Sequence, residues 1–158
     1  MVKFIQKKET RIPFTKEGYE KVLAEKETLL KERPDAVENL RKSRELGDLS
    51  ENGYYKAARA RLSSIDANLR KLDRLRKLGV IITSQKNGNV DIGSTIVVSC
   101  EEKEYTYTLV GGYESDPKKG TISYMSPLGK ALIGKSVGDV VTISVPAGIK
   151  EYTILKVN

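Results

Sequence analysis

The sequence predicts an α+β protein in which a long helical hairpin precedes a smaller domain of strands. Two observations support this. Residues 15–79 are rich in leucine and charged side chains at helical spacing, whereas residues 90–158 are rich in β-branched residues and turn signals. The composition changes between Leu78 and Val90, so residues 80–89 are expected to form a linker between two domains.

The first arm of the hairpin is expected to begin at Thr15, whose hydroxyl group is suited to cap a helix N-terminus. Pro34 is expected to bend this arm, because a proline inside a helix removes one hydrogen bond and clashes with the preceding turn. Apolar residues at roughly helical spacing mark one face of this arm, namely Tyr19, Val22, Leu23, Leu29, Leu30, Val37 and Leu40.

The second arm shows the alternating spacing of three and four residues that is typical of a coiled-coil seam. The seam residues are Tyr55, Ala58, Leu62, Ile65, Leu69 and Leu72. The turn-forming residues LGDLSENG separate the two arms, which favours an antiparallel hairpin. About 30 residues per arm at 1.5 Å each predict a rod roughly 45 Å long.

The second domain is predicted to combine half-buried strands with one short helix. Ser126 and Pro127 precede the expected helix Leu128–Ile133 as cap and first-turn residue, and Gly134 ends it. Alternating apolar and polar residues predict strands over Ser94–Ser99, Tyr105–Val110 and Val140–Val145.

Composition excludes several kinds of active site. The 158 residues contain no histidine and a single cysteine, so a Cys/His zinc site, a Ser-His-Asp triad and a Cys-His pair cannot form. The lone Cys100 also excludes an intramolecular disulfide, which suits a reducing cytoplasm, and we expect it to be a small packing residue. No apolar run approaches the roughly 20 residues of a membrane span, and the opening MVKFIQKKET lacks a signal-peptide core.

Positive charge is concentrated in the first half of the chain. Residues 1–79 contain 20 basic and 13 acidic side chains, while residues 80–158 contain 8 of each. The excess is largest in Tyr54–Gly79 and in residues 1–14, which we interpret as a basic N-terminal extension. Such segments commonly bind polyanions or acidic protein surfaces, and they are equally consistent with a solvated helix face.

Two acidic residues, Asp48 and Glu51, lie in the turn between the arms. Their spacing matches a capping box, in which the aspartate accepts a hydrogen bond from a backbone amide and the glutamate reaches back to the cap. Their carboxylates are also the hard oxygen ligands that Mg²⁺ prefers, although two are too few to hold the ion alone. The second interpretation requires further ligands from a partner.

Several tyrosines of the second domain allow two interpretations. They are a candidate stacking platform for nucleic-acid bases. Aromatic residues at strand spacing also commonly fill sheets. The residues concerned are Tyr105, Tyr107, Tyr113 and Tyr124.

Over roughly Pro13 to Val157, the sequence resembles the bacterial Gre transcript-cleavage factors of RNA polymerase. The matching segments are IPFTKEGYEKVLAE, RPDAVENLRKSRELGDLSEN, VDIGSTIVV, YTLVG and ISYMSPLGKALIGKSVGD. The resemblance implies an antiparallel coiled coil followed by an FKBP-like α+β domain. It also implies that the second domain docks outside the polymerase secondary channel, while the coiled coil enters the channel. A hairpin whose two arms pair with each other does not require a dimer, so we expect a monomer.

By the same resemblance, the chain is not itself an enzyme but stimulates the polymerase to cleave the 3′ end of backtracked RNA. Asp48 and Glu51 would then share an Mg²⁺ ion with the polymerase, and the chain alone would bind no cofactor. Arg44 and Arg59 match basic positions of the family and would face RNA phosphates or acidic channel walls. Surface charges exposed to solvent remain the simpler interpretation of both arginines.

The tip departs from the family pattern, because Gly53 and Tyr54 follow Asn52 where the family usually has alanine and a further acid. One alternative is therefore a secondary-channel regulator that binds the polymerase without stimulating cleavage. Two further alternatives are an autonomous nucleic-acid-binding coiled coil and a prolyl isomerase. The last has little support, since the segment GTISYMSPLG offers no evident aromatic prolyl pocket.

Overall fold

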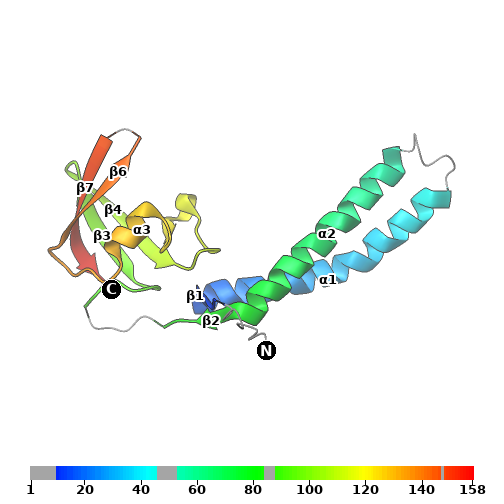
Figure 1. Cartoon of the computed structure of the whole chain (residues 1–158), viewed down its shortest axis with the longest axis horizontal. Coiled ribbons are helices and arrows are strands. Elements are labelled where there is room, and N and C mark those ends of the chain that lie inside the picture. Colours follow the sequence, from blue (N-terminus) through cyan, green and yellow to red (C-terminus); the bar gives the residue numbers. More distant parts are fainter. Residues whose placement is uncertain (1–9, 46–52, 84–87, 147) are drawn as a thin grey trace, which may run out of the picture. The chain divides into compact units, whose positions relative to one another are not determined.

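The computed structural model describes residues 10–45, 53–83, 88–146 and 148–158. Two long helices and a five-stranded sheet dominate the described part of the chain (Figure 1). These residues divide into two compact units. The hairpin unit consists of Glu20–Leu78, and the sheet unit combines the described residues up to Tyr19 with Gly79–Asn158.

The hairpin predicted from the sequence is confirmed. Helix α1 spans Lys16–Glu45 and runs without interruption across Pro34, and helix α2 spans Gly53–Leu78. The two helices are antiparallel, because Lys26 pairs with Asp73 whereas Arg33, further along α1, pairs with Asp66, which precedes Asp73.

The α2 seam predicted from the sequence also forms. Four of the six predicted seam residues are buried, namely Ala58, Ile65, Leu69 and Leu72, while Tyr55 and Leu62 are half-buried. Leu75, which the sequence did not single out, is buried as well. Within the hairpin unit, the buried α1 positions are Val22, Ala36 and Ser43, with Leu29 packed against the same core. These four α1 positions are spaced by seven residues, which is the repeat of a coiled-coil seam.

The prediction of one apolar face along α1 is partly wrong. Leu23, Leu30 and Val37 are exposed, although the sequence placed them on one rough apolar face with Val22 and Leu29. Each follows a seam position by one residue, and one residue turns a helix by about 100°, which moves the side chain off the contact with α2. The buried α1 positions near the turn are alanine and serine, which an apolar count does not weigh.

A short parallel pair of strands begins the sheet unit, which the sequence did not predict. Strand β1 (Ile12–Phe14) pairs with β2 (Gly79–Ile81). Phe14 is fully buried, and its ring contacts those of Tyr19 at 5.9 Å and Tyr113 at 6.4 Å between centroids.

Five strands form the main sheet, in the order β5-β4-β3-β7-β6. Only the β4–β5 pair is parallel. A 3₁₀ turn, η1 (Pro117–Lys119), precedes β5. The strands are β3 (Thr95–Cys100), β4 (Lys103–Val110), β5 (Thr121–Ser123), β6 (Val140–Val145) and β7 (Gly148–Val157).

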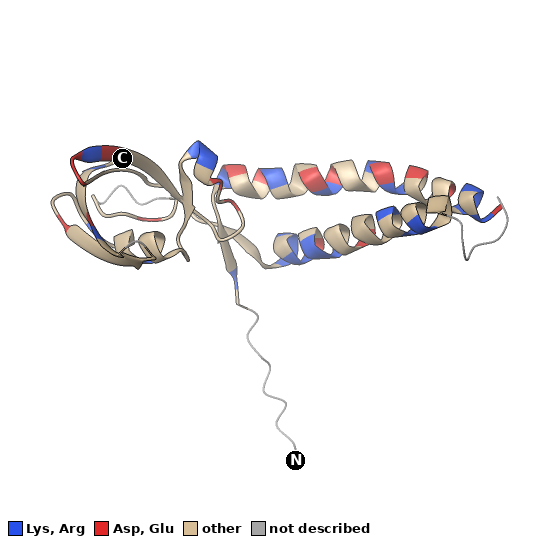
Figure 2. Cartoon of the chain, turned by 90° about the horizontal axis from the view of Figure 1, so that it is seen from above, with Lys and Arg blue, Asp and Glu red and all other residues tan. Residues whose placement is uncertain are grey.

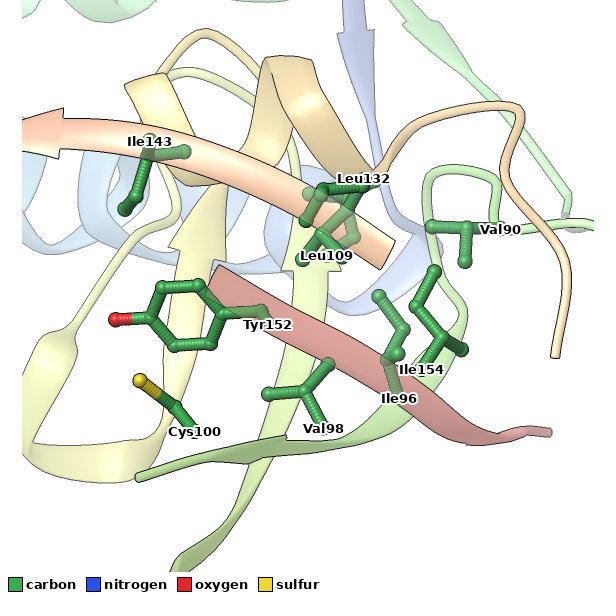
Figure 3. Close-up of a cluster of buried hydrophobic side chains, with 10 residues drawn as sticks. Val90, Ile96, Val98, Cys100, Leu109, Leu132, Ile143, Tyr152 and Ile154 are labelled. Atoms are coloured by element: carbon green, nitrogen blue, oxygen red, sulfur yellow. The ribbon is translucent and has the colours of Figure 1, made fainter. Parts of the chain in front are cut away.

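One contiguous apolar core fills the inner face of this sheet. Cys100 is buried within it, as expected of a small packing residue (Figure 3). Tyr107 and Tyr124 pack against the same core, so these two tyrosines fill the sheet. The core consists of Val90, Ile96, Val98, Cys100, Leu109, Leu132, Val141, Ile143, Tyr152 and Ile154.

The short helix predicted after Ser126 is confirmed as α3 (Pro127–Leu132). The Ser126 hydroxyl accepts a hydrogen bond from the Gly129 amide at 3.0 Å and caps the helix. Leu132 anchors α3 in the core. A Cβ atom at Gly129 would collide with the Ser123 carbonyl, so the glycine lets α3 lie against the end of β5.

Glu114 joins the loop after β4 to the first turn of α1. Its Oε1 atom accepts hydrogen bonds from the Thr15 amide at 3.0 Å and the Gly111 amide at 3.1 Å. Its Oε2 atom accepts from the Thr15 hydroxyl, which in turn accepts from the Gly18 amide at 3.0 Å. The N-cap predicted at Thr15 is therefore present, with a carboxylate as a further acceptor.

Candidate functional site

The turn between the two long helices is the candidate site from the sequence. Asp48 and Glu51 lie outside the described residues, so their capping and metal-binding interpretations both stay predictions. The described helix ends on either side are Glu45 of α1 and Gly53 of α2. Gly53 is the first residue of α2 and not an interior residue, so the full interior penalty of a glycine does not apply.

Small residues are buried on both helices toward this end of the hairpin. Ser43 and Ala36 of α1 are 0% and 1% exposed, and Ala58 of α2 is 7% exposed. The Ser43 hydroxyl donates to the Leu40 carbonyl at 2.8 Å, so its polar group is satisfied within α1. The buried positions named here at this end of the described hairpin therefore carry small side chains.

Arg44 and Arg59 are both exposed, and neither forms an ion pair with any residue the structure describes. The cations that precede Arg44 on α1 do form ion pairs. Arg41 donates to Glu38 and Glu45, and Lys42 lies 3.8 Å from Glu38. The hydrogen bond from Arg41 lowers the pKa of Glu38 below its ordinary value, so this carboxylate is already neutralised within α1.

On α2, two further exposed cations accompany Arg59, and sequence reasoning did not single them out. Lys56 and Arg61 form no ion pair within the described part of the chain. Figure 2 shows both charge colours along α1 and mostly blue along α2. The short spacing Lys-x-x-Arg-x-Arg after the turn is the signal that identifies them.

These cations can bind phosphate groups or carboxylates near the turn. Exposed Lys and Arg side chains without acidic partners can attract a polyanion, because no carboxylate of the chain competes for them. Among the described residues, no group of three acidic, cysteine or histidine side chains is placed to hold a metal ion. Asp48 and Glu51 are not among those residues, so an Mg²⁺ ion shared between these two residues and another molecule stays a prediction.

The sheet unit offers a second candidate surface, around α3. Met125 is 57% exposed and directly precedes Ser126, the N-cap of α3. An exposed apolar side chain at this position is a candidate for a protein contact. The four tyrosines do not form one platform, since Tyr113 stacks on Phe14 whereas Tyr105 stacks on Tyr107.

No helix in the described ranges is both long and apolar enough to cross a membrane. The long helices α1 and α2 are densely charged over their whole length.

Comparisons with known proteins cover both units. A family profile described as "Transcription elongation factor, N-terminal" matches residues 12–78. A second, described as "Transcription elongation factor, GreA/GreB, C-term", matches residues 85–158. Together they cover nearly the whole chain.

Individual relatives agree with these profiles. "Transcription elongation factor GreA" from Nitratiruptor sp. is 42% identical over 153 residues, which are 94% of this chain and 94% of the relative. The protein of the same name from Aliarcobacter butzleri is 45% identical over 150 residues, with 92% and 93% covered. A solved structure, the GreA factor homolog Gfh1 of Thermus thermophilus, is 24% identical with a TM-score of 0.44 and covers 94% of this chain and 99% of that chain.

The two family profiles match the hairpin unit and the sheet unit in turn. The two relatives are more than 40% identical over more than nine-tenths of the chain. The chain therefore belongs to the GreA/GreB family of transcription elongation factors.

Proposed function

We propose that this protein stimulates RNA polymerase to cleave the 3′ end of backtracked RNA. The observation that supports this most is the match to GreA/GreB elongation factors over both units of the chain. The hairpin would enter the secondary channel and bring the turn to the active site. The protein would supply ligands and charge, while the polymerase would supply the nuclease.

In this proposal, the hairpin delivers two carboxylates to the active site of the polymerase. The described part of α1 ends at Glu45 and α2 begins at Gly53, on either side of the segment that contains Asp48 and Glu51. When bound between factor and polymerase, Mg²⁺ would lower the pKa of its water and neutralise charge in the transition state. Asp48 and Glu51 would hold oxygen atoms toward that ion and orient the attacking water.

The cations beside the turn would act on binding and not on the chemistry. Arg59 lies eight residues after Glu51 in the sequence and six residues, roughly 9 Å, along α2 from its first residue, Gly53. We therefore expect Arg59 to lie beyond the reach of a metal held by Glu51. Arg44 and Arg59 would instead attract the phosphates of extruded RNA or acidic walls of the channel.

Asp48→Asn tests the carboxylate role. We expect stimulated cleavage of backtracked complexes to be lost while polymerase binding and helix content are kept. Asparagine caps helices as well as aspartate does, so a pure capping role predicts full cleavage. The matched control is Asp35→Asn, which removes an exposed carboxylate of α1 that has no ion pair among the described residues.

Two results would contradict the proposal in different ways. If wild-type protein binds the polymerase but stimulates no cleavage, the chain is a channel regulator without a cleavage role. If instead it binds free nucleic acid with steep salt dependence and shows no affinity for polymerase, the autonomous nucleic-acid-binding function would replace it.

Arg59→Ala tests the binding role of the cations. We expect severalfold weaker affinity for backtracked complexes at low salt, because exposed charge contacts are each worth about 1 kcal/mol or less. Cleavage at saturating factor should equal that of wild type, and the difference in affinity should shrink as salt screens the contact. A variant that binds normally but cannot cleave at saturation would place Arg59 in the chemistry.

A further inference from the structure

Three exposed apolar side chains of α1 form a row that the hairpin itself does not use. Leu23, Leu30 and Val37 are 40%, 50% and 41% exposed. They are spaced by seven residues, so at 100° per residue they lie within about 40° of one another on the helix surface. Single exposed leucines are ordinary, but a row at this repeat is the pattern with which one helix packs against another. We call this row the apolar stripe.

The apolar stripe borders the side of the hairpin on which the two helices exchange ion pairs. Lys26 and Arg33 each follow a stripe leucine by three residues, and they donate to Asp73 and Asp66 at 2.6 and 2.7 Å. These hydrogen bonds lower the pKa of both aspartates below the ordinary value. Both carboxylates are therefore paired with cations of α1, and neither offers an unpaired negative charge to a further partner.

Beyond these ion pairs, α2 presents a row of cations on the same side. Arg59, Arg70 and Lys77 lie within about 20° of one another around α2 at 100° per residue. Arg70 and Lys77 each follow an ion-paired aspartate by four residues, one helical turn, which places them beside it. All three are exposed, and among the described residues none has a salt bridge of its own. We call them the cationic row.

The chemistry of this face identifies its occupant. Leucine and valine at heptad spacing match apolar residues of a facing helix, whereas nucleic acid offers phosphates and bases that stack on aromatic rings. The cationic row then requires carboxylates on the same partner helix. A second copy of this chain would bring the same cations to this face, and the repulsion between like charges disfavours a dimer of this chain.

We propose that this face of the hairpin binds an amphipathic helix of RNA polymerase that carries apolar side chains at heptad spacing beside a row of carboxylates. The choice of polymerase as partner rests on the proposed function. Pro34 lies within the stripe's side of α1 and has no N–H, so the carbonyl of Leu30 lacks its usual helical donor. That carbonyl is an additional acceptor for the partner in the middle of the stripe.

The apolar contribution is tested by replacing the stripe with glutamine, a good helix former, in the full-length protein. We expect Leu23→Gln, Leu30→Gln and Val37→Gln together to weaken binding to RNA-free core polymerase at least about tenfold, a difference of 1.4 kcal/mol. Added salt should change this loss little. The matched control, Ala24→Gln with Thr28→Gln, alters uncharged exposed residues on another side of α1 and should bind like wild type.

The charge contribution is tested with two pairs of variants of equal charge. Arg70→Gln with Lys77→Gln removes two members of the cationic row, and Lys21→Gln with Lys71→Gln removes two exposed cations, one from each helix, that lie more than about 90° around the helix from the apolar stripe and from the cationic row. We expect severalfold weaker polymerase binding for the first pair only, with the loss vanishing at high salt. Equal losses for both pairs would mean general attraction by the basic hairpin and would overturn the proposal.

A photo-crosslinking amino acid at Leu30 identifies the partner directly, with the same group at Glu32 as the control on the opposite side of α1. We expect the Leu30 position to label one acidic helix of polymerase, and labelling of nucleic acid there would overturn the proposal. Unchanged binding of the glutamine stripe variant would also overturn it. If that happens while wild-type protein binds polymerase and stimulates cleavage, the inference fails and the proposed function stands.

Discussion

The hairpin and the sheet unit bury their apolar residues in different ways. In the hairpin, one row of side chains from each helix meets along a single seam, and the remaining faces stay in water. In the sheet unit, side chains from β3, β4, β6, β7 and α3 converge on one core. The difference teaches that the hairpin has surface to spare for partners, while most of the stabilising contacts between distant parts of the chain lie in the sheet unit.

The largest expected effect comes from truncating the core of the sheet unit. Leu109 is 0% exposed within a ten-residue cluster, so Leu109→Ala should cost about 3–5 kcal/mol of unfolding free energy. Leu72→Ala on the hairpin seam should cost about 2–3 kcal/mol, since a single seam relaxes more easily around a gap. Urea unfolding followed by circular dichroism measures both, and a larger loss for Leu72→Ala would reverse the comparison.

Gly18→Ala is expected to have the next largest effect and an unusual sign. Alanine ordinarily stabilises a helix by about 1 kcal/mol relative to glycine. Here its Cβ atom would collide with the Glu114 carboxylate, and displacing that group breaks three hydrogen bonds. We expect a net loss of about 1–3 kcal/mol in thermal or urea unfolding.

The sign provides the control for this prediction. In a Glu114→Ala background the collision is absent, so Gly18→Ala should then stabilise the protein. Stabilisation by Gly18→Ala in the wild-type background would mean that Glu114 contributes nothing at this position.

The sheet unit should also contribute to docking, with a moderate effect. Met125→Gln is expected to weaken polymerase binding severalfold, because it replaces an exposed apolar side chain beside α3. Ile149→Gln is the matched control, since Ile149 is 74% exposed on β7. Competition with wild-type protein for core polymerase measures both, and equal effects of the two variants would argue against docking at α3.

The smallest expected effect concerns the ion pair of Arg33 and Asp66. The hydrogen bond from Arg33 lowers the pKa of Asp66 below its ordinary value of 3.8. A carboxyl group with a lowered folded-state pKa contributes stability that is present above pH 3.8 and is lost as the pH falls through the folded-state value. Asp66→Asn should therefore lower the urea midpoint slightly at neutral pH and leave it unchanged near pH 2, and an equal shift at both pH values would contradict this.

Local signals in the sequence determined much of this protein. The two helices, the Thr15 and Ser126 caps and the strand over Val140–Val145 were all predicted from spacing and capping residues. These features depend on residues close together in the chain, which propensity and periodicity describe well. The acids of the turn were also singled out by sequence, although only an experiment on the complex tests their role.

The contacts between distant residues came only from the tertiary structure. The parallel pairing of β1 with β2 joins residues that are 67 positions apart, as at Ile12 and Gly79, and Glu114 accepts hydrogen bonds from Thr15 across 99 positions. No local pattern encodes such pairs. Likewise, a one-residue difference in phase decides whether a leucine of α1 is buried or exposed, and only the packing of α2 fixes that phase. The sequence determines which helices and strands can form, and the tertiary structure decides which of their faces remain free for a partner.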